Sequence, residues 1–188
     1  MKKMSQSLTL IGIVLSVMVL LSACATAPQE QPKGDAGGQT PGLYKNDEYR
    51  FTAEYPDHYV PERLQGDDVF RAVNTNTYKI PVFNVTVADA KAGVALDANA
   101  WIKSAQKATP GSKRFKVLSE EMVTLNDGTP GLLVFYKWTF SDGMTKLQTA
   151  SMWIIKNGKS ISASATTILG GDTTPDKLKA MVSSIKFF

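Results

Sequence analysis

Four consecutive strand candidates separated by tight-turn sequences constrain the fold of this 188-residue chain more than any other feature. The candidates cover residues 115–125, 132–140, 146–155 and 160–168. The segments between them contain Asn126-Asp127-Gly128, Ser141-Asp142-Gly143 and Asn157-Gly158. Asn-Gly and Asp-Gly supply the positive φ angles that tight hairpin turns require. The sequence therefore predicts four successive antiparallel strands.

Further strand and helix patterns lie on both sides of this series. Apolar residues alternate or run continuously at 51–55, 69–73 and 82–88, which predicts three more strands. Asp97 is a suitable N-cap for a helix over 98–108. Thr174 followed by Pro175 marks the start of a second helix. We expect an α+β fold with a central antiparallel β-sheet and helices packed on its faces.

The N-terminus has the parts of a secretory signal. Lys2 and Lys3 precede a largely apolar run at 8–21. As a helix, these 14 residues would span about 21 Å, which is less than the ~30 Å hydrocarbon core of a bilayer. The following Leu21-Ser22-Ala23-Cys24 resembles the lipobox of bacterial lipoproteins. We therefore expect residues 1–23 to be a lipoprotein signal peptide.

The resemblance to lipoproteins implies that Cys24 becomes the first residue of the mature chain and carries the lipid anchor. Two or three acyl chains, such as palmitate, hold a protein stably at a bilayer, whereas one chain gives marginal binding. Ala25 stands where lipoproteins of the inner membrane typically have Asp. The resemblance thus implies a location at the outer membrane, facing the periplasm. An incidental cysteine after an ordinary signal peptide is the alternative.

The mature chain divides into a tether and one domain. Residues 24–42 combine the expected lipidated cysteine with a segment that is rich in Pro and Gly and has no aromatic residue. Such a segment buries too little apolar surface to offset its ordering entropy, so we expect a flexible tether. Every Trp, Tyr and Phe of the chain follows it. We expect residues 43–188 to form a single globular domain.

The start of this domain resembles that of PsbP-like proteins. Residues 49–59 read YRFTAEYPDHY, an alternating strand that runs into Tyr-Pro, with Tyr59 where the family usually has Trp. The later order of elements also matches, from the helix around Trp101 to the hairpin series and the closing helix. The resemblance implies a PsbP-like α/β/α sandwich, as in DcrB-type bacterial lipoproteins. It also implies a non-catalytic binding or accessory domain without a cofactor, and it names no partner.

Charge and residue types argue against several classes of function. Loss of Lys2 and Lys3 with the signal peptide lowers the formal net charge from +4 to +2, which gives no case for a nucleic-acid partner. One Cys and one His leave no ligand set for a zinc site, so no metal is expected. The chain contains no Gly-x-Ser-x-Gly elbow of a hydrolase.

A few polar groups remain as candidates for catalysis or Ca²⁺ binding. They are His58, the pair Asp67-Asp68 and the pair Glu120-Glu121. Neither acidic pair has the spacing of a calcium loop, and adjacent strand residues point to opposite faces. We interpret His58 as an exposed loop residue and the acidic pairs as solvated strand ends. The chain is therefore not expected to be an enzyme.

A basic stretch in the middle of the domain is the candidate contact surface. Five cations occur within 14 residues that contain no Asp or Glu: Lys103, Lys107, Lys113, Arg114 and Lys116. Lys103 and Lys107 are four residues apart and share a helix face. We expect this stretch to contact an anionic partner, such as lipid headgroups or an acidic protein. A solvated helix face is the alternative.

Three functions remain open. A non-catalytic, lipid-anchored envelope protein that binds or assists another envelope component agrees best with the clear anchor and the scarcity of catalytic groups. A carrier of a small apolar ligand or lipid would need a cavity, which Trp101, Trp138 and Trp153 could line. A hydrolase would need two carboxylates with separated pKa values, and the sequence nominates no such pair.

Overall fold

The computed structural model describes residues 42–74, 82–91 and 93–188. The expected signal peptide, Cys24 and residues 25–41 of the expected tether lie outside these residues. Gly42, the last residue of the expected tether, is the first residue of a strand. Within the described part of the chain, no helix has the length and apolar character that a membrane span requires.

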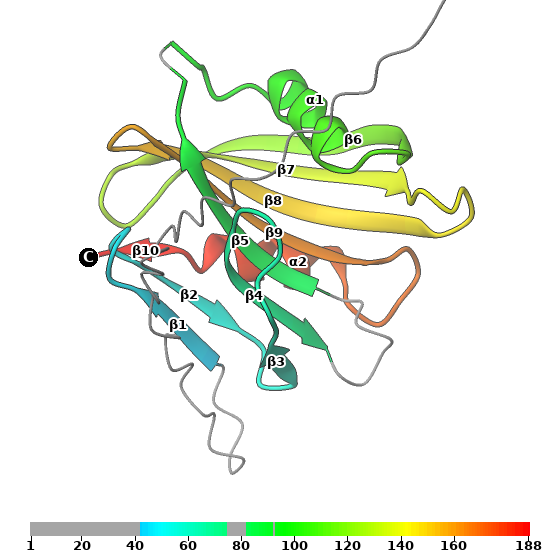
Figure 1. Ribbon diagram of the computed structural model, residues 1–188, viewed down its shortest axis with the longest axis horizontal. Helices are drawn as coiled ribbons and strands as arrows, with labels where there is room; N and C mark the ends of the chain where they lie inside the picture. Colours follow the sequence, from blue (N-terminus) through cyan, green and yellow to red (C-terminus); the bar gives the residue numbers. More distant parts are fainter. Residues whose placement is uncertain (1–41, 75–81, 92) are drawn as a thin grey trace, which may run out of the picture. The chain divides into compact units, whose positions relative to one another are not determined.

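The main sheet of the described residues has seven antiparallel strands in the order β3-β4-β5-β9-β8-β7-β6 (Figure 1). These strands are β3 (Tyr59–Pro61), β4 (Asp68–Asn74), β5 (Val82–Asp89), β6 (Lys113–Thr124), β7 (Pro130–Thr139), β8 (Lys146–Lys156) and β9 (Lys159–Ile168). The four strands predicted from the hairpin turns are β6 to β9, and each pairs with the next. That prediction is confirmed.

Three short strands form a second sheet, which the sequence did not predict. The expected strand β2 (Phe51–Tyr55) pairs on one side with β1 (Gly42–Asn46) and on the other with β10 (Lys186–Phe187). β10 joins the two ends of the domain, because Lys186 pairs with Thr52. No local pattern encodes a pairing over such a separation, which explains why the sequence missed β10.

The two helices contact opposite faces of the main sheet. They are α1 (Ala98–Ala108) and α2 (Pro175–Ser183). Val134 of β7 is buried in one apolar cluster with Trp101 of α1. The next residue, Phe135, is buried in another cluster with Leu178 of α2. Because alternate strand residues point to opposite faces, we call these the α1-side cluster and the α2-side cluster.

The helix starts agree with the sequence. Asp97 Oδ1 accepts a hydrogen bond from Ala100 N at 2.8 Å, and Thr174 Oγ1 accepts one from Lys177 N at 3.4 Å. Both predicted N-caps are therefore confirmed. The α2-side cluster also contains Phe51 of β2, so it joins the small sheet to the main one. The chain is a sheet-rich α+β protein.

Candidate functional site

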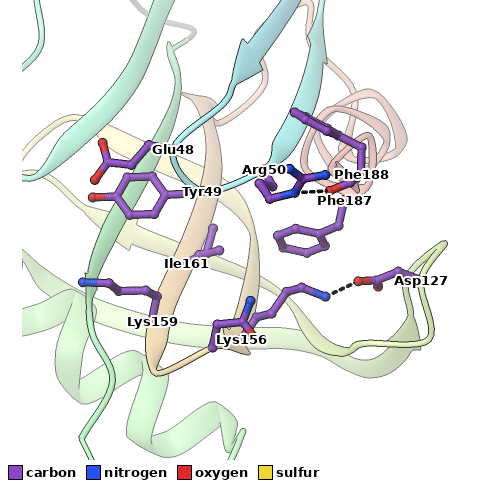
Figure 2. Close-up of a pocket in the computed structure, with 10 residues that line it drawn as sticks. Glu48, Tyr49, Arg50, Asp127, Lys156, Lys159, Ile161, Phe187 and Phe188 are labelled. Atoms are coloured by element: carbon purple, nitrogen blue, oxygen red, sulfur yellow. Dashed lines mark hydrogen bonds and ion pairs between the residues drawn. The ribbon is translucent and has the colours of Figure 1, made fainter.

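A pocket of about 510 Å³ opens at one end of the main sheet (Figure 2). The β6–β7 and β8–β9 turns lie at the same end because successive antiparallel strands reverse direction, and the β1–β2 turn and β10 meet them there. The lining residues are Glu48, Tyr49, Arg50, Asp127, Lys156, Asn157, Lys159, Ile161, Phe187 and Phe188. We call this cavity the turn-end pocket.

Arg50 occupies an unusual backbone conformation at the end of the β1–β2 turn. Its φ is 55°, in the left-handed region that costs a non-glycine residue on the order of 1 kcal/mol. Two backbone-directed contacts hold it there. Phe188 N donates to Arg50 O at 3.1 Å, and Arg50 Nε donates to Phe188 O at 2.8 Å. Among the described residues, the Nη groups of Arg50 have no hydrogen-bond partner, so they remain available at the pocket.

Asn126 fixes the aromatic side of the pocket. Its Nδ2 donates to Phe187 O at 2.9 Å, and its Oδ1 accepts from Phe187 N at 3.1 Å. The amide side chain thus replaces one strand partner of β10 and ties it to the β6–β7 turn. The Phe188 ring lies under two cations, with the Arg50 guanidinium 5.2 Å and Lys45 Nζ 4.8 Å from its centroid.

Lys156 and Asp127 form an ion pair at the base of the pocket. Lys156 Nζ also donates to Thr129 Oγ1 at 3.0 Å and lies 4.6 Å from the centroid of the Phe187 ring. The hydrogen bonds from Lys156 and from the Thr129 backbone lower the pKa of Asp127 to about 2. The Asp127 carboxylate is therefore charged throughout the physiological pH range and lies against the Lys156 side chain.

The other side of the pocket carries two more polar pairs. Lys159 Nζ donates to Asp89 Oδ1 at 2.6 Å, which lowers the pKa of Asp89 and raises that of Lys159. Hydrogen bonding to the Glu48 carboxylate raises the pKa of Tyr49. Figure 2 shows Glu48, Tyr49 and Lys159 on one side of Ile161 and the two phenylalanines on the other.

This arrangement suits a ligand with an apolar part and an acidic group. The floor is apolar and aromatic, and the two lysines are already paired with aspartates. Among the described residues, Arg50 is the pocket cation without an acidic partner, and its planar guanidinium matches a carboxylate or phosphate group. Within the described residues, no cluster of three or more His, Cys, Asp or Glu side chains could hold a metal ion.

The polar residues that the sequence analysis considered for catalysis lie at separate places. His58 is exposed in the turn before β3, and its Nδ1 lies 3.1 Å from Asp57 Oδ1. Glu120 and Glu121 are exposed on β6. None of these residues lines the turn-end pocket.

The interpretation of the Asp67-Asp68 pair as a solvated strand end is wrong for Asp68. Asp68 is buried, with 9% of its surface exposed. Asn84 Nδ2 donates to its Oδ1 at 2.8 Å, and Arg71 Nη1 lies 3.6 Å from its Oδ2. Burial raises the pKa of Asp68, while these two partners oppose the shift. The long side chain of Arg71 on the same strand makes this burial possible.

The five predicted basic contact residues are all exposed, but they divide between two faces. Lys103 and Lys107 lie on α1. Lys113 and Lys116 pair with residues of β7 on the face that contacts α2, and Arg114 lies in a β-bulge between them. None of the five lines the turn-end pocket.

The three tryptophans considered for a carrier cavity belong to the core. Trp101 and Trp153 are buried in the α1-side cluster with ring centroids 5.8 Å apart, and Trp138 packs against that cluster. The indole Nε1 groups of Trp138 and Trp153 donate to Thr149 Oγ1 and Ser160 Oγ at 2.9 and 2.8 Å. The tryptophans do not line the turn-end pocket.

None of the pocket residues was predicted as a site from the sequence. Asn126-Asp127-Gly128 and Asn157-Gly158 were predicted as turns, and both are turns in the structure. Their approach to the β1–β2 turn depends on β10, which was not predicted. A signal for the β1–β2 turn exists in the Asn46-Asp47 dipeptide, since Asn46 Oδ1 accepts from Tyr49 N at 2.9 Å.

Comparisons with known proteins identify the fold. No family model matches the chain, and no curated protein matches it. Among solved structures, it is similar to cyanobacterial PsbP (CyanoP) from Synechocystis sp. PCC 6803, with 15% identity and a TM-score of 0.65 over 85% of this chain and 99% of that one. This sheet-rich α+β protein therefore has a PsbP-like fold, as the sequence resemblance implies.

Two further solved structures match the chain with lower TM-scores. A protein of unknown function from Pseudomonas aeruginosa, described as a putative regulator, matches with 18% identity and a TM-score of 0.40, over 75% of this chain and 87% of that one. A structure from Bacteroides thetaiotaomicron VPI-5482 matches with 12% identity and a TM-score of 0.50, over 80% of this chain and 48% of that one.

Proposed function

We propose that this chain is a lipid-anchored protein of the bacterial envelope, whose domain binds another envelope component and performs no catalysis. The lipobox-like sequence at Cys24 supports the anchor, and Ala25 favours the outer membrane with the domain facing the periplasm. In this proposal the domain is an α/β/α sandwich of the DcrB type, with the α1-side and α2-side clusters as its two interlayer cores.

The observation that carries the binding role is the turn-end pocket. It combines an aromatic floor with one arginine whose terminal donors are unused among the described residues. Arg50 holds a strained backbone at the same position. Strain of this kind persists where surrounding contacts enforce it and is typical of functional sites. An apolar side chain followed by an acidic one, on an exposed segment of a partner protein, would satisfy both parts of the pocket.

Site-specific photo-crosslinking in cells tests this role. The full chain carries the photoreactive amino acid benzoylphenylalanine at Tyr49, in the pocket, or at Val60, which is 48% exposed on β3. We expect one envelope protein to be crosslinked from position 49 and not from position 60. Arg50→Glu should reduce that adduct at least tenfold, because it replaces the free donors with a repelling charge. Identical adducts from both positions, or none from position 49, would contradict a binding role for the pocket.

A carrier of a small apolar ligand is the second candidate function. The pocket volume of about 510 Å³ lies within the range of roughly 300–1,000 Å³ that ligand sites usually have. Ile161, Phe187 and Phe188 supply the apolar lining. Native mass spectrometry of the full chain extracted from membranes separates the two candidates. A carrier retains a ligand mass beyond that of the protein, and Phe188→Glu removes it, whereas a binding domain has no such added mass in either form.

A further inference from the structure

Four lysines gather at the end of the main sheet that lies opposite the turn-end pocket. Lys113 of β6 and Lys146 of β8 both pair with Thr139 of β7. Two residues earlier in β7, Lys137 pairs with Lys116 of β6. Directly paired residues of antiparallel strands place their side chains on the same face. The four lysines therefore form two neighbouring rows on the α2 side, which we call the four-lysine patch.

The four-lysine patch places like charges where they repel. Lys116 and Lys137 are directly opposite, a pairing in which Cβ atoms lie about 4.5–5.5 Å apart and like charges destabilise the sheet. Within the described part of the chain, none of the four lysines has an acidic partner. Asp142 is the acidic residue of the adjacent β7–β8 turn. Its Oδ1 accepts hydrogen bonds from Met144 N and Thr145 N of the same turn, both at 2.8 Å.

Exposed apolar side chains lie at the same end of the sheet. Phe140, Met144, Ile168 and Leu169 have 44%, 82%, 44% and 42% of their surface exposed. The two segments that carry them are adjacent, because Leu169 N donates to Lys146 O at 2.8 Å and Phe140 N donates to Thr145 O at 2.8 Å. We call these four side chains the apolar tip. The Phe140 ring lies 6.1 Å from that of Trp138 on the α1 side, so the apolar tip and the four-lysine patch meet at the end of the sheet, beside Lys146, and not on one face.

We propose that the four-lysine patch and the apolar tip together dock this end of the domain on a bilayer that contains anionic phospholipids. Apolar side chains that enter the headgroup region, flanked by lysines, are the usual chemistry of interfacial binding. Each lysine near an anionic surface raises binding roughly fivefold. A stable complex with a protein partner usually buries about 800 Å² of surface on each side. The apolar tip is smaller than such an interface, because it consists of four side chains on two turns.

The depth of Met144 in reconstituted vesicles tests this proposal on the full chain. An environment-sensitive fluorescent amino acid replaces Met144, and the protein is reconstituted into phosphatidylcholine vesicles with or without phosphatidylglycerol. We expect its emission to shift to the blue, with quenching by doxyl-labelled lipid, when phosphatidylglycerol is present. The same amino acid at Glu48, in the pocket, should stay in water and remain open to iodide quenching. Vesicle flotation of each sample reports anchoring separately.

Charge reversal supplies the matched control. Lys113→Glu with Lys116→Glu should lower the docking equilibrium constant, obtained from the emission shift as the phosphatidylglycerol content is raised, at least roughly twentyfold. Lys91→Glu with Lys103→Glu changes the net charge equally at exposed positions outside the patch and the pocket, and it should leave the shift unchanged. A Met144 probe that stays in water, or a shift independent of phosphatidylglycerol, would overturn the proposal. Crosslinking from Tyr49 tests the other end of the sheet, so either proposal can fail alone.

Discussion

Two arginines adopt the left-handed backbone region, and they lie at opposite ends of the main sheet. Arg50, at the turn-end pocket, has a φ of 55°, and Arg114, beside the four-lysine patch, has a φ of 56°. Glycine would occupy either position without steric cost. Arg50 is held by hydrogen bonds with Phe188, whereas within the described residues Arg114 has no hydrogen bond from its side chain. The two positions should therefore respond differently to glycine.

Arg114→Gly is expected to stabilise the protein by about 1 kcal/mol, because it removes the cost of the left-handed conformation. The free energy of unfolding from denaturant titration measures this change. Arg114→Ala is the control, and it should leave stability nearly unchanged because alanine has the same backbone restriction. A stabilising alanine variant would show that charge repulsion in the basic stretch, and not φ, sets the cost.

Asp127 predicts a dependence of stability on acid pH. Its folded-state pKa is about 2, below the ordinary value of 3.8, so the unfolded chain takes up the proton first as pH falls. Its contribution is therefore complete above about pH 4 and is lost as the pH falls towards 2. Thermal unfolding across this range should show a shallower pH dependence in Asp127→Asn than in the parent chain. Equal slopes in the two proteins would contradict the role assigned to the Lys156 ion pair.

At the scale of elements, a single side chain of another turn supplies the hydrogen bonds along one edge of β10. Its two residues pair with β2 on one side, while Asn126 donates to and accepts from Phe187 on the other. Asn126→Ala removes both of these bonds and should cost about 1–3 kcal/mol. It should also release β10 locally.

Amide hydrogen exchange measures that release. In Asn126→Ala, the amides of Phe187 and Phe188 should exchange faster, while those of β8 keep their protection. Asn126→Asp is a useful comparison, because it keeps the acceptor for Phe187 N and loses the donor to Phe187 O. Unchanged protection of Phe187 in the alanine variant would show that pairing with β2 alone holds β10.

The sequence predicted the elements whose information is local. The strands β6 to β9 follow from turn dipeptides, and both helices follow from cap residues such as Asp97. β1 is only five residues long and pairs with the adjacent β2, whereas β10 has two residues and finds the same partner from the other end of the domain, so no periodicity reveals them. The turn-end pocket depends on that same long-range pairing. The four-lysine patch was found in part, since Lys113 and Lys116 are close in sequence while Lys137 and Lys146 are brought in by strand register.

At the scale of the whole domain, the α2-side cluster makes both sheets one cooperative unit. It contains Phe51 from the small sheet, Phe83 and Met152 from the main sheet, and Leu178 from α2, all almost completely buried. Leu178→Ala should destabilise the protein by about 2–5 kcal/mol, because it leaves a cavity between the two sheets. Global unfolding followed by denaturant titration gives this value.

The three tryptophans provide an independent probe of the same variant. They lie in or against the α1-side cluster, on the opposite face from Leu178. Tryptophan fluorescence and far-ultraviolet circular dichroism should therefore give the same shifted midpoint in Leu178→Ala. Separate midpoints would show that the two faces unfold independently.

The strand β8 separates the two ends of the main sheet. Its 11 residues, at about 3.3 Å each, set the β7–β8 turn about 35 Å from the β8–β9 turn. When Met144 lies among lipid headgroups and β8 points away from the bilayer, the length of the strand places Arg50 in the aqueous space. A partner that stays close to the bilayer surface would not reach the pocket. Only a partner that extends from the bilayer by about the length of β8 could bind there.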